Sequence, residues 1–308
     1  MIRKAKSKAK TAAERTGGIT MLADYHVHTI YSDDSEYPME EVVKDAIALG
    51  LSEICFTDHV DYGIKRDWDD PRGVEYRRGG PGEPERIPVV NVNYPEYAAE
   101  FGSLKEKYKD RISLKMGMEF GMQTHTIPQY EKLFSAYPFD FIILSVHQVE
   151  DKEFWTQDFQ KGRTQEEYNL RYYEEILELV RRYHNYSVLG HLDLISRYDK
   201  EGYFPFERIR PVVAEILKTV IADGKGIEIN TSSHRYGLRD LTPSRDILRL
   251  YRDLGGEVIT IGSDSHKKEH LGAYVRETMG EMKELGFKAY YTFDKMIPVP
   301  HYFKAPLA

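Results

Sequence analysis

Seven short apolar runs recur along this chain, separated by segments of helical periodicity, and no other feature constrains the fold as strongly. The runs are LADYHVH, EICFTDH, ISLKMGMEF, FDFIILSVH, YSVLGH, GIEIN and EVITIGSDSH. Strands that alternate with helices predict a mostly parallel sheet. Six of the seven runs carry an imidazole or a carboxylate at or next to their last residue, and in an open sheet such residues would gather at one switch point. Their spread therefore predicts a closed α/β barrel with its site at the carboxyl ends of the strands.

The segments between the runs have the apolar spacing of helices. In PMEEVVKDAIALG the apolar side chains form one stripe, and Gly50 closes the segment. The same pattern is expected in YPEYAAEFGSLKEKY, TIPQYEKLFSAY, EEYNLRYYEEILELVRRYH, FERIRPVVAEILKTVIADG and PSRDILRLYRDLGG. Each of these lies between two runs, as βαβ units require.

Residues 61–93 interrupt this alternation. The segment is crowded with Gly, Pro and Arg and has no regular period. Loops of this length are usually functional or mobile. Because it follows the run that ends at His59, we expect it to rise over the site. Its arginines would either meet an anionic substrate or be solvated surface charges.

Composition narrows the class of protein. The chain has 308 residues, a formal net charge of -7, 30% charged residues and 41% hydrophobic residues, which predicts one catalytic domain and disfavours nucleic acid as a partner. No run is long enough to cross a bilayer, and the start lacks the features of a secretory signal, so we expect no membrane partner and a cytoplasmic location. The single cysteine, Cys55, lies inside an apolar run and is expected in the core.

The first twenty residues, MIRKAKSKAKTAAERTGGIT, have no apolar periodicity. We predict a disordered basic extension over 1–20 and the catalytic domain over 21–308. A mis-assigned start and a short targeting segment are the alternatives for the extension.

The residues that end the runs are candidate metal ligands. His26 and His28 alternate on a predicted strand, so both side chains would point the same way. Glu119 lies in the apolar sequence GMEFG, where a carboxylate needs a cation or strong hydrogen bonds. Asp264 and His266 are expected to alternate on a strand end. With His59, His147 and His191 these residues predict a site for more than one divalent ion, although a salt bridge or a chance histidine is the alternative for each.

The roles of several other polar residues are less clearly indicated by the sequence. Asp33 and Asp34 both follow His28 within one loop, and the residues alone do not choose between them. His234 follows the strand end at Asn230 and is expected near the substrate. The remaining histidines do not end apolar runs, so we expect surface or helix positions for His125, His184, His270 and His301.

The motifs together resemble a known family. DYHVHTIYSDDS, FTDH, GMEFG, SVH, GHLDLI, EINTS and IGSDSH occur in this order between about residues 22 and 272, as in the PHP (polymerase and histidinol phosphatase) superfamily of metal-dependent phosphoesterases. RYYEEILELV, GHLDLISRY and EINTSSHRYG are most similar to the histidinol-phosphate phosphatases within it. The resemblance implies a distorted (β/α)7 TIM-like barrel that holds three divalent ions, which would be Zn, Mn, Fe or Co.

The resemblance also implies a ligand assignment. One ion would be bound by His26, His28, Glu119 and Asp264, a second by Asp34, His59 and His266, and a third by His147 and His191, with Glu119 bridging. Asp34 is preferred to Asp33 because it stands just before a Ser-Glu pair, as the family ligand does. The basic extension and the long segment 61–93 depart from the family pattern and leave the exact substrate in doubt.

Clustered divalent ions suit the hydrolysis of a phosphate monoester, because they neutralise phosphate charge and acidify a water that becomes the hydroxide nucleophile. Glu119, Asp264 and His266 are the predicted catalytic residues. The substrate would be held by a set of basic and amide side chains, for which the candidates are Arg163, Arg197, Asn230, His234 and Arg235. Each arginine could instead be a surface ion-pair residue.

The expected substrate is L-histidinol phosphate, which would be hydrolysed to L-histidinol and phosphate in histidine biosynthesis. A PHP phosphoesterase for another small ester, such as a sugar or nucleotide phosphate, is the first alternative. An amidohydrolase would also use an H-x-H pair on a barrel. This class is disfavoured because its usual bridging lysine has no counterpart at the end of a predicted strand. A non-catalytic PHP-like module would have lost ligands that this chain retains.

Overall fold

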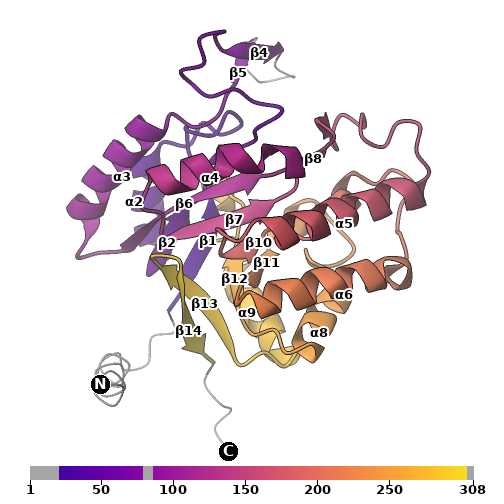
Figure 1. Cartoon of the computed structure of the whole chain (residues 1–308). Coiled ribbons are helices and arrows are strands. Elements are labelled where there is room, and N and C mark those ends of the chain that lie inside the picture. The colour runs from indigo at the N-terminus through magenta and orange to yellow at the C-terminus, as the bar shows by residue number, and fades with distance from the viewer. Residues whose placement is uncertain (1–20, 79–85, 304–308) are drawn as a thin grey trace, which may run out of the picture.

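The computed structural model describes residues 21–78 and 86–303 (Figure 1). The predicted basic extension, residues 1–20, lies outside the described residues. Seven parallel strands form the sheet, in the order β1-β2-β6-β7-β10-β11-β12. Their bounds are Ala23–Val27 (β1), Glu53–Phe56 (β2), Ser113–Gly121 (β6), Phe141–Ser145 (β7), Val188–Leu189 (β10), Gly226–Asn230 (β11) and Ile259–Gly262 (β12). A short strand, His59–Val60 (β3), also pairs with β6.

The two edges of this sheet meet. Val27 forms a parallel bridge with Ser265, just beyond β12, and the His28 amide donates to the Ser265 carbonyl at 2.8 Å. The strands therefore form a nearly closed barrel, which confirms the predicted α/β barrel of seven strands.

Helices connect successive strands, as the periodicity predicts. They are Met39–Leu49 (α2), Tyr94–Tyr108 (α3), Ile127–Ala136 (α4), Gln165–Arg182 (α5), Phe206–Ala222 (α6), Arg245–Asp253 (α8) and Val275–Glu284 (α9). Local sequence fixes several ends: Gly50 adopts φ 76° after α2, and Thr164 with Glu167 forms a capping box at the start of α5. All six predicted helical segments are confirmed.

Several short elements carry residues of the candidate metal centre that is described below. A four-residue helix, Ser232–Arg235 (α7), follows β11, and a 3-10 turn, Leu194–Tyr198 (η2), follows β10. Two further 3-10 turns span Thr124–Thr126 (η1) and Lys268–His270 (η3), and a small hairpin joins Gln148–Val149 (β8) to Lys152–Glu153 (β9).

The segment 61–93 is more regular than its composition predicts. It contains an antiparallel hairpin, Glu75–Arg78 (β4) with Arg86–Val89 (β5), which projects away from the barrel at the top of Figure 1. Arg66 pairs with Glu75 and Arg72 with Asp70, so these two arginines are neutralised within the segment. The expectation of a segment without regular structure is therefore wrong for β4 and β5.

The opposite end of the barrel is covered by a hairpin that the sequence did not predict, Ala289–Asp294 (β13) with Ile297–Tyr302 (β14). The Tyr25 hydroxyl donates to the Phe293 carbonyl at 3.1 Å and accepts from the Phe293 amide at 2.8 Å. Cys55 is buried in the core, as expected. Among the described helices, none is long and apolar enough to span a membrane.

Candidate metal centre

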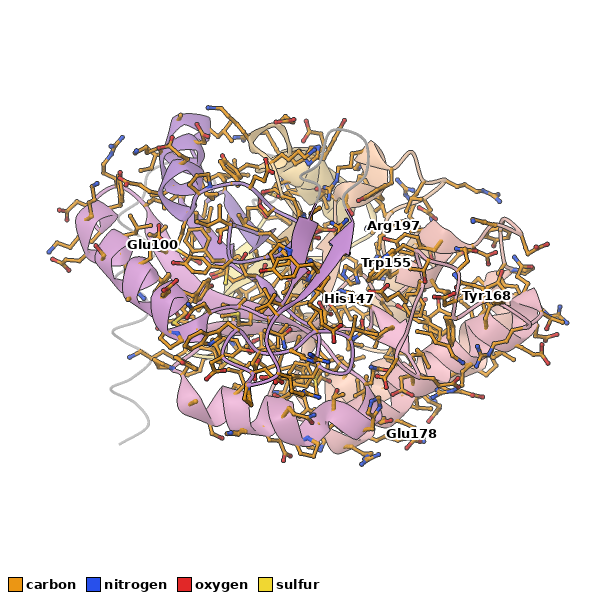
Figure 2. The ribbon with its side chains drawn as sticks, turned by 90° about the horizontal axis from the view of Figure 1, so that it is seen from above. Glu100, His147, Trp155, Tyr168, Glu178 and Arg197 are labelled. Atoms are coloured by element: carbon orange, nitrogen blue, oxygen red, sulfur yellow. The ribbon has the colours of Figure 1, made fainter. Side chains whose placement is uncertain are left out.

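The predicted ligands converge at the carboxyl ends of the strands, mostly from the loops that follow them. His28 lies one residue beyond β1, and His147 and His191 each lie two residues beyond their strands. Asp264 does not alternate with His266 on a strand end, as the sequence suggested, because β12 stops at Gly262 and Asp264 adopts φ 55°. Figure 2, which shows the side chains from above, labels His147 near the centre of the view.

A first group of atoms surrounds one point between β1 and β12. His26 Nε2 lies 3.1 Å from Glu119 Oε2 and 3.8 Å from Asp264 Oδ1. His28 Nε2 lies 3.6 Å and 3.5 Å from the same two oxygens. All four side chains are buried.

A second group joins Asp34, His59 and His266. His59 Nε2 and His266 Nε2 face each other at 3.4 Å, and they lie 3.6 Å and 3.2 Å from Asp34 Oδ2. Asp33 instead forms an ion pair with Lys65 at 2.7 Å. This geometry supports Asp34 rather than Asp33 as the carboxylate of the group.

A third group uses the other oxygen of Glu119. Glu119 Oε1 lies 3.1 Å from His147 Nε2 and 2.8 Å from His191 Nε2, and the two imidazole nitrogens are 3.4 Å apart. Because Oε2 belongs to the first group, Glu119 stands between the first and third groups. His59 Nδ1 is also 3.0 Å from Oε2, without hydrogen-bond geometry.

These separations fit atoms that share an ion. Zinc ligands lie about 2.0–2.2 Å from the metal, so two ligands of one ion are roughly 3–3.5 Å apart. The buried His28 Nε2 has no hydrogen-bond partner among the described residues, although two carboxylates lie near it. An unpartnered imidazole nitrogen that faces carboxylates is what a metal position requires. The described residues thus provide groups capable of holding several metal ions.

Two carboxylates that the sequence analysis missed hold the outer nitrogens of the ligands. Glu228 Oε1 lies 2.6 Å from His26 Nδ1, and Glu228 Oε2 accepts from the His191 amide at 2.9 Å. Asp61 Oδ1 lies 2.7 Å from His147 Nδ1. Such contacts fix the tautomer and ring orientation of a metal-binding histidine. Each of the two residues was detectable as an acidic side chain within or just after an apolar run.

Glycine and serine residues make room for this arrangement. A Cβ at Gly121 would collide with the Asp61 carboxylate and lie 2.6 Å from His147 Nδ1. Ser145 donates to Glu119 Oε1 at 2.7 Å, so the carboxylate is held from the barrel side as well. The backbone at the end of β6 is therefore shaped around the pair of Asp61 and His147.

The electrostatics favour an anionic Glu119 beside the protonated imidazoles of His26 and His147. Burial opposes ionisation, but His26 and His147 outweigh it and hold the pKa of Glu119 well below its usual range. Burial acts against protonation of His147, yet Glu119 and Asp61 raise the pKa of His147 to about 9. Metal ions that bind here would therefore replace the protons of His26 and His147.

Two predicted substrate arginines lie beside Asp264. The Arg197 guanidinium has one terminal nitrogen 3.8 Å from Asp264 Oδ2, and Arg235 approaches the same oxygen to 3.6 Å. Arg235 also donates to the Ser263 and Asp264 carbonyls, both at 2.6 Å. Arg197 donates to Ser232 Oγ at 2.6 Å, while its buried Nε has no partner among the described residues.

The other substrate candidates are placed differently. Asn230 is buried beside the centre, with its amide nitrogen 3.5 Å from His26 Nδ1. His234 is exposed and stacks on Tyr274, with ring centroids 4.3 Å apart. Arg163 donates to Glu150 and to the Phe159 carbonyl, and none of its described contacts joins it to a ligand group. Substrate binding by His234 and Arg163 stays a prediction.

The four histidines for which surface or helix positions were expected lie apart from the ligand groups. His125 and His184 are exposed, and His270 lies in the turn η3, as expected. His301 differs, because it is half-buried on β14, where Nε2 lies 2.8 Å from Thr292 Oγ1.

Comparison with known proteins agrees with this geometry. A histidinol-phosphatase of Lactococcus lactis is 34% identical over 278 residues, which cover 89% of this chain and 94% of that protein. A Thermotoga maritima protein named probable histidinol-phosphatase is 27% identical over 87% of this chain and 94% of its own length. The crystal structure of Lactococcus lactis histidinol phosphate phosphatase, complexed with zinc, L-histidinol and phosphate, superposes with a TM-score of 0.75 at 31% identity and covers 90% of this chain and 98% of that one.

The family model for the PHP domain matches residues 24–232, from β1 to the start of α7. This range includes the histidine pair, Glu119, His147 and His191. With the relatives that extend the similarity over most of the chain, the match establishes that this chain belongs to the PHP domain family.

Proposed function

We propose that this protein is a metal-dependent phosphatase that hydrolyses L-histidinol phosphate to L-histidinol and phosphate. The observation that carries the proposal is the set of three ligand groups, two of which share Glu119, beside two arginines at Asp264. The Lactococcus lactis relative, whose crystal structure holds zinc, L-histidinol and phosphate, supports the choice of substrate.

The proposed ligands are His26, His28, Glu119 and Asp264 for one ion, Asp34, His59 and His266 for another, and Glu119, His147 and His191 for a third. Divalent ions bound there would supply Lewis acidity to the phosphoryl group and to water. The donor set of imidazoles and carboxylates accepts Zn, Mn, Fe or Co.

Arg197 and Arg235 would bind the phosphate of the substrate. The Arg197 side chain is only 8% exposed, and one of its terminal nitrogens donates to Ser232 Oγ. The guanidinium carbon lies 4.2 Å from the centroid of the Tyr236 ring, which holds the planar group in place. Charge-assisted hydrogen bonds from such a fixed group orient the phosphate for in-line attack.

Asp264 has one oxygen on each side of the site. Oδ1 faces His26 and His28, whereas Oδ2 faces the two arginines. Burial opposes ionisation, but His26 outweighs it and holds the pKa of Asp264 well below its usual range. A carboxylate with so low a pKa stays ionised, so Asp264 would act as a metal ligand through Oδ1 and would hold the two arginines for the substrate phosphate through Oδ2.

A substrate panel tests the proposal. Phosphate release by the Zn- or Mn-loaded protein is compared for L-histidinol phosphate, sugar phosphates, nucleotides and p-nitrophenyl phosphate, with chelator-treated protein as the control. We expect kcat/KM to be far higher for L-histidinol phosphate than for the rest, and to vanish with the chelator. Equal or higher activity on another ester would overturn the named substrate, and activity that survives the chelator would overturn metal dependence.

The proposal includes a cytoplasmic location, which fractionation with a specific antibody tests. It also treats residues 21–308 as the catalytic unit, because the described fold begins at residue 21 and the family match at residue 24. Truncation of residues 1–20 is therefore expected to leave kcat/KM unchanged.

A further inference from the structure

Lys65 is a largely buried cation near the start of the segment 61–93. Its side chain is 10% exposed, and its ammonium nitrogen lies 2.7 Å from Asp33 Oδ1 and 3.0 Å from Asp61 Oδ2. Both carboxylates are buried as well. An ammonium group has three donors, so it can serve two carboxylates at once. Because a buried lysine loses its hydration, these two partners must compensate for that loss, and the contact is more than a solvated surface pair.

Asp61 connects Lys65 to the third ligand group. Its Oδ1 lies 2.7 Å from His147 Nδ1, while its Oδ2 faces Lys65. Because the two oxygens have different partners, both contacts together define the plane of the carboxylate. Without Lys65 the carboxylate would be free to rotate, and the His147 ring would lose part of the contact that orients it toward Glu119.

Asp33 connects Lys65 to the second ligand group. It directly precedes Asp34, whose Oδ2 lies 3.2 Å from His266 Nε2. On the other side of Asp34, Ser35 Oγ donates to the His266 carbonyl at 3.0 Å. Asp34 is thus held between two anchored neighbours. Lys65 also neutralises the carboxylate of Asp33, which would otherwise compete with Asp34 for an ion.

The backbone around Lys65 is itself well fixed. The Lys65 amide donates to the Asp61 carbonyl at 2.8 Å, which closes a turn. Asn91 joins the two ends of the segment, because its Oδ1 accepts from the Asp61 amide at 2.9 Å and its Nδ2 donates to the Lys65 carbonyl at 3.5 Å. The ammonium group is therefore presented from an ordered turn, as a positioning role requires.

We propose that Lys65 is a positioning residue that joins the second and third ligand groups and raises the affinity of both for divalent ions. It acts through the loop of Asp34 on one side and through the orientation of His147 on the other. None of its ion pairs within the described structure reaches His26 or His28, so the first group is expected to depend on it least. The start of the segment 61–93 would thus serve metal binding.

A site-resolved zinc titration tests the proposal without turnover. Crystals of wild type and of Lys65→Met are equilibrated with a series of chelator-buffered zinc concentrations, and the height of each anomalous peak gives the occupancy of one ligand group. In Lys65→Met the zinc concentration for half occupancy should rise about tenfold or more in the second and third groups, because an outer contact of their ligands is lost. In the first group it should rise far less.

Lys115→Met is the matched control. The Lys115 side chain is 12% exposed and also lies beside two carboxylates, 2.8 Å from Asp294 and 3.9 Å from Glu53, at the opposite end of the barrel. Its replacement should leave all three half-occupancy concentrations unchanged. An equal rise in all three groups of Lys65→Met, no rise, or a rise in only one of the second and third groups would overturn the joining role.

Two further variants keep the proposal testable if Lys65→Met fails to fold. Lys65→Met combined with Asp33→Asn removes the buried carboxylate that is left without a cation, and it should still weaken zinc binding in the third group because the contact to Asp61 is lost. Wild-type occupancy of that group would overturn the link through Asp61. Lys65→Arg retains a cation and should bind zinc more tightly than the double variant, and equal or weaker binding would contradict the role of the charge.

Phosphate release gives a separate readout, which rests on the proposed function. Excess zinc should return the kcat of Lys65→Met to near the wild-type value, because the variant weakens ion binding and leaves the first-group ligands and the two arginines in place. A loss of kcat that excess zinc does not reverse would contradict a role in metal binding. A failed substrate panel leaves the zinc titration valid, and unchanged zinc occupancies leave the phosphatase proposal intact.

Discussion

Replacement of Glu119 by glutamine is the most informative single change at the centre. The carboxylate is fully buried, and its two oxygens face different ligand groups: Oε2 lies near His26 and His28, and Oε1 near His147 and His191. Glutamine has nearly the same shape but no charge, and one of its two ends is a donor rather than an acceptor.

The magnitude follows from the ligand count. Because the amide keeps one acceptor oxygen, either the first group falls from four proposed ligands to three or the third group falls from three to two. One bound ion contributes several kcal/mol to transition-state stabilisation, and about 1.4 kcal/mol corresponds to a tenfold change in rate. We therefore expect Glu119→Gln to lower kcat/KM by roughly a thousandfold or more, together with loss of metal.

Three measurements on the purified variant check this expectation. Elemental analysis should show fewer ions per chain than in wild type, phosphate release should be lost, and circular dichroism should show a retained fold. Glu178→Gln, an exposed glutamate of α5, is the matched control and should keep both metal and activity. A Glu119→Gln protein with a full metal complement and full activity would refute the bridging role.

Three other outcomes are expected. Glu228→Gln weakens the 2.6 Å contact to His26 Nδ1 and should lower metal affinity about 10–100-fold in chelator competition. Unchanged metal affinity would show that Glu228 does not orient His26 for metal binding. Arg197→Ala should raise KM for the phosphate ester with unchanged metal content, more than Arg163→Ala does, and equal effects would contradict the placement of Arg197. Zinc added to metal-free protein near neutral pH should release protons, because the raised pKa of His147 leaves its imidazole charged below about 9; calorimetric heats that do not depend on the buffer would contradict this.

The barrel and most of the site could be predicted because the information is local. An apolar run followed by a histidine specifies both the strand and the end at which its ligand lies. His147 and His191 illustrate this, since each lies two residues beyond its strand in the structure and reaches Glu119 from a different position around the barrel.

Some features of the site and fold were not predicted from the sequence. They depend on contacts between distant segments, or on a sequence argument that was applied to too few residues. Glu228 is a carboxylate within an apolar strand, and the argument that identifies Glu119 applies to it equally. The contacts of Arg235 with the Ser263 and Asp264 carbonyls join neighbouring loops, which periodicity alone does not place in contact. The hairpin β13–β14 escaped prediction because prolines at 298 and 300 obscure its strand pattern.

Anomalous diffraction from crystals of the zinc-loaded protein would test the central claim most directly. The account predicts three zinc peaks, one in each ligand group, with Glu119 between the peaks of the first and third groups and Asp34 at the second. A single peak, or a peak pattern in which Glu119 touches no ion, would contradict it.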